Sequence, residues 1–137
     1  MDMREINRGV IAEFREHDGK LSGPMEGAPI LLLTTTGRTS GTPHTTPLGF
    51  IDAGGRLAIA AANGGSDDHP DWFRNIERDS SVTVEVPGAT IPSRAEVATG
   101  SERDELLAAL VASLPGMSEH VTATSRAIPV VVLTERS

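Results

Sequence analysis

A short turn inside LLLTTTGRTSGTPHTTPLGF, residues Leu31–Phe50, has residue types suited to binding an anion. Gly37 and Gly41 can adopt a positive φ, so that successive backbone N–H groups point into one concavity. Arg38 adds a permanently charged, bidentate donor that matches phosphate or carboxylate. The stretch contains no acid, and three hydroxyl side chains add donors: Thr39, Ser40 and Thr42. The sequence predicts an anion-binding turn here; a plain hairpin loop with an exposed arginine is the alternative.

A second polar cluster, AAANGGSDDHPDWFRN, occupies residues Ala60–Asn75. Small side chains that lead into Gly64 and Gly65 permit a flat ligand to approach the backbone closely. Pro70 suits the first turn of a helix, whose N-terminus is a second candidate anion site. The alternative is a glycine turn followed by a capped helix, in which Trp72 is a core anchor and two polar residues face solvent: Arg74 and Asn75.

Several other kinds of catalytic site lack the residues they need. The chain contains no cysteine, which excludes disulfides, thiolate metal sites and thiol nucleophiles, so any redox chemistry requires a cofactor. No metal site is predicted, because ligand spacing is absent among three histidines: His44, His69 and His120. The adjacent acids Asp67 and Asp68 are interpreted as part of a solvated loop. No spacing indicates a nucleophile triad or a pair of catalytic carboxylates.

Length and composition favour one compact domain over 1–137, since 137 residues with 38% hydrophobic content can bury a core. A net charge of -7 and 3% aromatic content argue against nucleic-acid binding. The first residues, MDMREINRGVIAEF, are charged where a signal peptide needs an apolar core, and no apolar run approaches the roughly 20 residues of a membrane span. We therefore expect a cytoplasmic protein without stable membrane insertion.

The hydrophobic pattern predicts the elements that position these residues. An amphipathic helix is expected over about 4–18, where apolar residues recur at helical spacing before Gly19. Apolar runs predict about six strands, the last of them buried in the middle of a sheet: ILLLTTT, TTPLGFI, RLAIAAA, SVTVEV, IPSRAEVAT and IPVVVLTE. A two-turn helix follows Pro70, and a third helix starts at Ser101, with Asp104 in a capping position, and stops at the PG pair. This order favours a closed or half-closed antiparallel barrel over a parallel sheet.

Three segments resemble the deazaflavin-dependent nitroreductase family, small split β-barrel proteins of actinobacteria and related organisms. They cover most of the chain in the family's order: VIAEFREHDGKLSGPMEGAPILLLTTTGRTSGTPHTTPL, AANGGSDDHPDWFRNIERDSSVTVEV and TSRAIPVVVLTE. The resemblance implies an α+β fold that is mainly β, a split antiparallel barrel like those that bind FMN. It further implies a reductase that binds coenzyme F-420, a deazaflavin with a phosphate-containing polyglutamate tail. Hydride would pass to a small electrophilic acceptor such as a quinone, nitroaromatic, enone or biosynthetic intermediate.

The same resemblance assigns cofactor contacts residue by residue. The TGRTSG turn would hold the tail phosphate through Gly37, Arg38, Thr39, Ser40 and Gly41, with Pro43 and His44 beside it. The family's ASNGG element, which would lie along the deazaflavin ring, corresponds to Ala61, Ala62, Asn63, Gly64 and Gly65. Trp72 and Asn75 fall on the family's PAWYHNL helix and either shape the cofactor channel or pack. Arg126 would bind the coenzyme or an acid partner.

Departures from the family pattern bear on how firmly the coenzyme is held. The family often has lysine at Thr39, arginine at His44 and a basic residue in the loop that here carries Asp67 and Asp68. The anionic tail would therefore be held less firmly. The chain also has no tyrosine, where relatives line the substrate pocket with tyrosines, and Phe73 stands in one of those positions. His120, at another, is the candidate proton donor, with a histidine on the exposed face of a loop as the alternative.

Two other functions remain open from the sequence. The pocket could serve a cofactor-free isomerase or cyclase of natural-product biosynthesis, which would account for the altered basic and tyrosine positions. The protein could instead carry a cofactor or an apolar ligand without catalysis, and FMN is an alternative cofactor because its shorter phosphate tail needs fewer basic contacts. A homodimer is expected by analogy with related split barrels.

Overall fold

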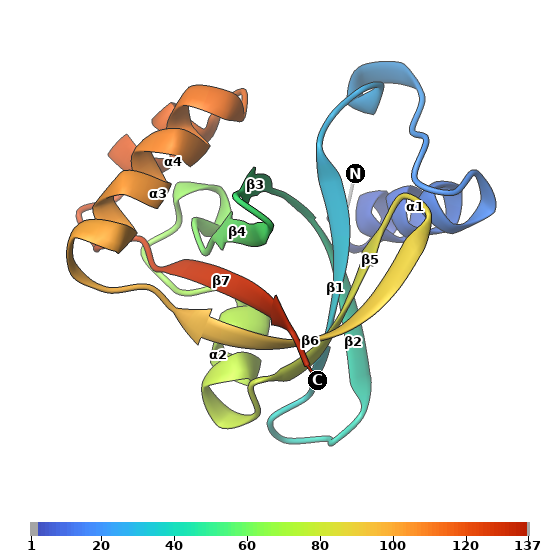
Figure 1. Ribbon diagram of the computed structural model, residues 1–137. Coiled ribbons are helices and arrows are strands. Elements are labelled where there is room, and N and C mark those ends of the chain that lie inside the picture. Colours follow the sequence, from blue (N-terminus) through green and yellow to red (C-terminus); the bar gives the residue numbers. More distant parts are fainter. Residues whose placement is uncertain (1–2, 137) are drawn as a thin grey trace.

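The computed structural model describes residues 3–136, in which one antiparallel sheet curls between helices (Figure 1). The elements in chain order are α1 (Met3–Glu16), η1 (Gly23–Met25), β1 (Ile30–Thr36), β2 (Pro43–Gly49), β3 (Ile51–Ala53), β4 (Arg56–Ala60), η2 (Asn63–Gly65), α2 (Asp71–Arg78), β5 (Ser81–Val86), β6 (Ala89–Val97), α3 (Gly100–Ser113), α4 (Met117–Thr122) and β7 (Val130–Glu135). Within these residues the sheet has seven strands in the order β2-β1-β5-β6-β7-β4-β3. The predicted antiparallel, barrel-like sheet with flanking helices is confirmed.

The two edge strands of this sheet, β2 and β3, are neighbours in the chain. Only Phe50 separates them, yet β2 pairs with β1 at one edge and β3 pairs with β4 at the other. A flat sheet would place these edges far apart, because each strand adds about 4.8 Å of width. The sheet must therefore curl until its edges meet, which gives the half-barrel.

Strand β7 carries two layers of core on its opposite faces. Val131 and Leu133 join the cluster inside the half-barrel, which includes residues of β1, β4, β5 and α2. Val130 and Val132 alternate with them and pack in a second cluster with Leu110 of α3. Because β7 lies between β6 and β4 and both its faces are covered, the predicted buried central strand is confirmed.

Helix α1 covers the other side of the sheet, over β1 and β2. Its Phe14 is buried against Leu32 and Leu21 in a third, smaller cluster. Next to that cluster the Arg15 guanidinium donates to both carboxylate oxygens of Glu85 in β5, at 3.0 and 2.8 Å. The apolar stripe of α1 and this ion pair fix the helix beside the site described below.

Four details differ from the sequence-based expectations. The expected strand TTPLGFI divides at Phe50 into β2 and β3, so the sheet has seven strands instead of about six. A further short helix, α4, follows the PG pair that was interpreted as a stop. The expected capping box at Ser101 does not form, because α3 begins at Gly100 with Thr99 as its N-cap. Helix α1 ends before Asp18, whose φ of 52° breaks the helical conformation.

Within residues 3–136, none of the helices has both the length and the apolar character that crossing a bilayer requires.

Candidate functional site

The turn between β1 and β2 uses its two glycines differently from the prediction. Gly41 has a positive φ of 71°, as expected, but Gly37 does not, so conformational freedom is not the reason for glycine at 37. Glycine at 37 instead leaves room for two side chains of the turn. A Cβ at 37 would lie 2.5 Å from the Ser40 hydroxyl and 2.8 Å from Nε2 of His44. Glycine there lets the turn close over its own polar side chains.

Hydrogen bonds occupy more of the backbone N–H groups of the turn than the two glycines suggest. The N–H groups of Gly37 and Gly41 donate within the turn, to the carbonyls of Thr42 and Gly37 at 2.8 and 2.9 Å. The N–H of Thr42 donates to the Ser40 hydroxyl at 3.2 Å. The Arg38 N–H donates outside the turn, to Oδ1 of an asparagine on α2 at 3.2 Å. In the described chain, the N–H groups without a partner in this turn are those of Thr39 and Ser40.

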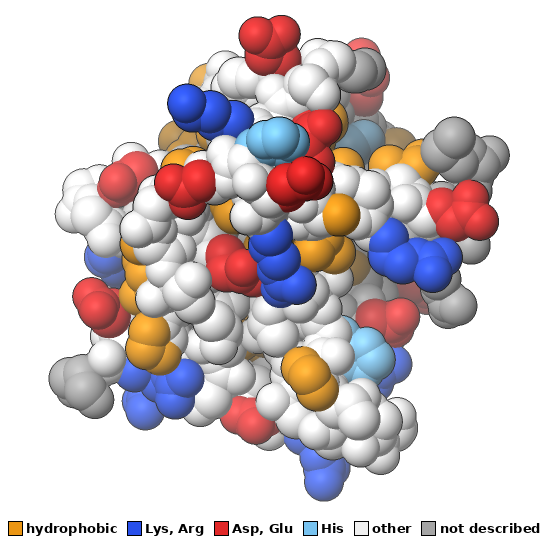
Figure 2. Space-filling model, turned by 90° about the vertical axis from the view of Figure 1, so that its right-hand side faces the viewer, with side chains coloured by type: hydrophobic (Ala, Val, Ile, Leu, Met, Phe, Trp, Pro, Cys, Tyr) orange, Lys and Arg blue, Asp and Glu red, His pale blue; other side chains and the backbone are white. Residues whose placement is uncertain are grey.

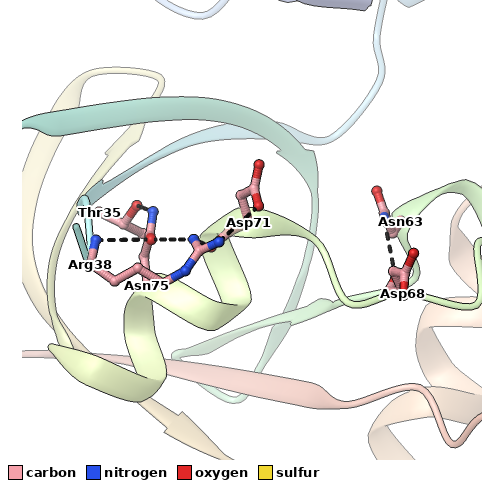
Figure 3. A network of polar contacts seen from close by, with 6 residues as sticks. All are labelled: Thr35, Arg38, Asn63, Asp68, Asp71 and Asn75. Atoms are coloured by element: carbon pink, nitrogen blue, oxygen red, sulfur yellow. Dashed lines mark hydrogen bonds and ion pairs between the residues drawn. The ribbon is translucent and has the colours of Figure 1, made fainter. Parts of the chain in front are cut away.

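Arg38 is bound to α2 by its side chain as well as its backbone (Figure 3). Nη1 donates to Oδ1 of Asn75 at 2.9 Å, and Nη2 forms an ion pair with Oδ1 of Asp71 at 3.3 Å. The Asn75 amide in turn donates to Oγ1 of Thr35 at 3.1 Å. Asn75 and Thr35 are only 4% and 2% exposed, so the alternative in which Asn75 faces solvent is wrong. A buried amide instead orients Arg38 at the end of β1.

Arg38 lies at the wall of a depression of about 820 Å³ between α1, the β1–β2 turn and α2. Thr45 and Thr46 of β2 line it together with Trp72, although Trp72 also belongs to the core. Helix α1 contributes three residues that the sequence did not indicate as site residues: Asn7, Arg8 and Ile11. The amphipathic pattern predicted this helix but not what its polar residues would face. His44 also lines the depression, and Pro43 begins β2 as an exposed residue at the mouth of the turn.

Charges of both signs are interspersed on the face of the molecule that carries α1 (Figure 2). No single-sign patch covers the part of that face formed by the described residues. Recognition of an anion must therefore depend on a local arrangement. The depression provides one, since Arg8 and Arg38 line it together and carry formal positive charge at neutral pH.

The segment Ala61–Gly65 lies outside this depression. Ala61 and Ala62 are buried, and Gly65 is covered by α4: a Cβ at 65 would lie 2.7 Å from Cβ of Ala123 and 3.0 Å from the His120 carbonyl. The Asn63 amide donates to the Asp68 carbonyl at 3.0 Å, beyond the N-terminal end of α2 (Figure 3). The assignment of this segment to the deazaflavin ring stays a prediction.

The Arg126 side chain is hydrogen-bonded to the loop that follows β4. Its guanidinium donates to three carbonyls, those of Ser66 at 2.8 Å, Ala61 at 3.1 Å and Ala62 at 3.0 Å, and Nη1 lies 3.1 Å from Nδ1 of His69. None of these partners is the acid that the sequence suggested. The nearby acid Asp67 instead accepts from the Thr124 hydroxyl at 2.7 Å. A coenzyme contact for Arg126 stays a prediction, and its observed contacts are structural.

His120 lies on α4, not on a loop. The helix packs against η2, and His120 is half-buried there, away from the residues that line the depression. The proposed role of this histidine as proton donor stays a prediction. The histidine that does line the depression is His44, whose Nε2 is 3.4 Å from the hydroxyls of Ser40 and Thr42.

Comparison with known proteins decides the family. The model of the F420H(2)-dependent quinone reductases matches residues 6–135. The chain belongs to this family. It is 30% identical, over 129 residues, to the F420H(2)-dependent quinone reductase Rv1261c of Mycobacterium tuberculosis, covering 91% of this chain and 87% of that one. The resemblance to deazaflavin-dependent reductases is thereby confirmed.

Two solved structures extend the family match to three dimensions. One is an F420-H2 dependent reductase, FDR-A, with a TM-score of 0.71 and 34% identity, covering 77% of this chain and 93% of that chain. The other is described as a domain-swapped dimer. It has a TM-score of 0.74 and 30% identity, and the match covers 92% of this chain and 95% of that chain. Members of this family are oxidoreductases that depend on reduced F-420.

Proposed function

We propose that this protein is an F-420-dependent oxidoreductase that reduces a quinone or a related small electrophilic acceptor. The single observation that carries the proposal is the Arg38 turn. Its oriented guanidinium borders a depression of about 820 Å³, and among the described residues the N–H groups of Thr39 and Ser40 in the same turn have no partner. The family match over residues 6–135 supports the same conclusion.

The residues present fit the phosphate-containing tail of the coenzyme. Arg38 would bind a phosphate oxygen, and the N–H groups of Thr39 and Ser40 would donate to the same group, since both charged and backbone donors bind phosphate well. Arg8 would add a second cation from α1. Trp72 supplies apolar surface in the same depression. When bound, the coenzyme supplies a hydride in one two-electron step.

The chain's own contribution to catalysis is then to bind and to orient. Asn75 is central to this task, because its buried amide holds both the backbone and the guanidinium of Arg38. An arginine fixed in this way loses little further conformational freedom when it binds an anion. Positioning of this kind contributes to rate by holding the reacting groups in a productive arrangement.

Titration of cofactor-free protein with F-420, followed by ligand fluorescence, tests the proposal. Arg38→Ala should weaken binding about ten- to hundredfold, because a charged hydrogen bond contributes roughly 1.5–3 kcal/mol. Arg38→Lys keeps the positive charge but loses the bidentate geometry of the guanidinium. Its affinity for F-420 should lie between those of Arg38→Ala and the unchanged protein. Arg94→Ala, on β6 and outside the depression, is the matched control and should bind as the unchanged protein does.

Oxidation of reduced F-420 by a panel of quinones, nitroaromatics and enones completes the test. Turnover that is lost in Arg38→Ala and retained in Arg94→Ala would support the reductase. Tight binding without hydride transfer to any acceptor would instead indicate a carrier. Binding of FMN in place of F-420 would change the cofactor assignment.

We also propose that the protein forms a homodimer. A structure 30% identical to this chain is described as a domain-swapped dimer, which supports the proposal. Light scattering coupled to size exclusion would test it, with a mass near twice the 14.4 kDa of one chain as the expected result. A mass of one chain at all concentrations would contradict it.

A further inference from the structure

Asp71 is the acid that contacts Arg38 among the residues that the structure describes. Oδ1 of Asp71 lies 3.3 Å from Nη2 of Arg38, and the Asp71 carbonyl accepts from Nη1 at 3.4 Å. Asp71 is also the one acidic residue among the described residues that line the depression. The basic residues that line it are Arg8, Arg38 and His44. The Asp71 carboxylate therefore offsets part of the positive charge of the depression.

The two side chains that bind Arg38 hold it with unequal strength. Asn75 is buried and accepts from Nη1 at 2.9 Å, whereas the Asp71 side chain is 87% exposed and its ion pair is longer. A solvent-exposed pair of this kind contributes little, because water screens the attraction and the side chains lose freedom. An incoming anion can therefore take Nη2 from Asp71 while Asn75 keeps Nη1. The guanidinium would exchange one partner and stay in place.

We propose that Asp71 is a competitor built into the anion site: its carboxylate occupies Arg38 until a phosphate ester displaces it. This inference rests on the proposed function for the identity of that ester, the phosphate in the F-420 tail. The incoming ligand must break this ion pair to reach Nη2, so Asp71 opposes binding through Arg38. The residue thereby lowers the affinity of the site and makes it depend on salt.

Asp71→Asn is the variant that tests the competitor. Neutralising the carboxylate should tighten binding of F-420 about two- to fivefold at low salt, the range expected for an exposed ion pair. The gain should shrink as salt rises. Inorganic pyrophosphate is the second probe, followed through the amide resonances of Thr39 and Ser40, and should show a gain in the same direction.

Two matched variants separate competition from a general change in charge. Asp68→Asn alters the net charge equally, but its carboxylate lies outside the depression, so affinity should not change. Asp71→Glu keeps the charge at the start of α2 and should not tighten binding. Melting temperatures of all three variants show whether the changed residues affect the fold.

The mechanism requires that Asp71 act through Arg38. In an Arg38→Ala background, Asp71→Asn should therefore give no gain for either probe. An equal gain in both backgrounds, or unchanged affinity for both probes in Asp71→Asn, would overturn the proposal. If the unchanged protein binds F-420 and Asp71→Asn binds it no better, only the competitor fails. If neither form binds F-420 but Asp71→Asn binds pyrophosphate more tightly, the competitor stands and the cofactor assignment fails.

Discussion

Asn75 is the residue whose loss should most disturb the Arg38 turn. It accepts from the Arg38 backbone and side chain and donates to the Thr35 hydroxyl, while only 4% of it is exposed. Asn75→Ala would leave the buried Thr35 hydroxyl without its donor and Arg38 without its anchor. We expect a loss of about 1–3 kcal/mol in the free energy of unfolding, measured by urea denaturation.

Arg74→Ala provides the control for that experiment. Arg74 is exposed on the neighbouring position of α2, so its truncation should change the free energy of unfolding by less than about 0.5 kcal/mol. If the two variants were equally stable, the buried network would not contribute to folding as the hydrogen bonds indicate.

Substitutions at the neighbouring glycines Gly64 and Gly65 test how closely α4 packs against this segment. Both have positive φ, 63° and 86°, so alanine at either position costs about 1–2 kcal/mol in backbone conformation. A Cβ at 64 would meet nothing within 4 Å, whereas one at 65 would press on Ala123 and the His120 carbonyl. Gly65→Ala should therefore lose roughly a further 1–3 kcal/mol, in thermal or urea unfolding. Equal losses would mean that α4 is not held against this segment.

At the scale of elements, the end of α1 is tied to the following loop by Glu13. The Ser22 backbone N–H donates to its carboxylate at 2.7 Å and the Ser22 hydroxyl at 2.9 Å. These bonds, the backbone one above all, lower the pKa of Glu13 below its ordinary value of 4.5. The Ser22 cap thus favours the ionised carboxylate.

The pH dependence of stability follows from that pKa. Because the folded-state pKa lies below the unfolded value, the stabilisation is complete above about pH 4.5 and is lost as the pH falls through the folded-state pKa. We expect Glu13→Gln to lose stability relative to the unchanged protein at pH 6.5, and the difference to shrink in acid. Urea midpoints at several pH values measure it. Glu16→Gln removes one carboxylate from an exposed position of the same helix and is the control for a general change in charge.

The elements with a clear hydrophobic pattern, whether periodic or continuous, were predicted well from the sequence. The continuous apolar run of β7 indicated a strand with both faces covered, and that is where it lies. Helix α4 was missed because its six residues are too few to show a period and follow a PG pair. The division of β2 from β3 was missed as well, since it depends on how far the whole sheet curls.

Some features of the candidate site could likewise be predicted from the sequence, and others could not. Arg38 could be named as a candidate anion ligand from its own type and the glycines of its turn, and that role stays a prediction. The burial of Asn75 could not be predicted, because its partners Arg38 and Thr35 come from a segment 37 and 40 residues earlier in the chain. Arg8 has the same limitation: its helix was predicted, but the depression that it lines exists only once α1 lies beside β2.

At the scale of the whole molecule, β7 joins two parts of the sheet. It pairs with β6 on one side and β4 on the other, and it bears residues of both main core clusters. A chain that ends at Pro129 lacks this strand and should lose cooperative unfolding in urea and the dispersion of its amide resonances. A chain that ends at Glu135 retains the strand and should unfold cooperatively. Cooperative unfolding of the shorter chain would contradict the central role of β7.

The position of β7 also has a consequence for how the protein emerges from the ribosome. Strands β3 and β4 are made early, but their only pairing to the rest of the described sheet, apart from each other, is through β7, which is made last among the strands. At ordinary elongation rates the β3–β4 hairpin waits on the order of ten seconds with apolar residues exposed. Folding during translation therefore cannot proceed strand by strand, because β4 gains its partner in the rest of the sheet only when β7 has been made.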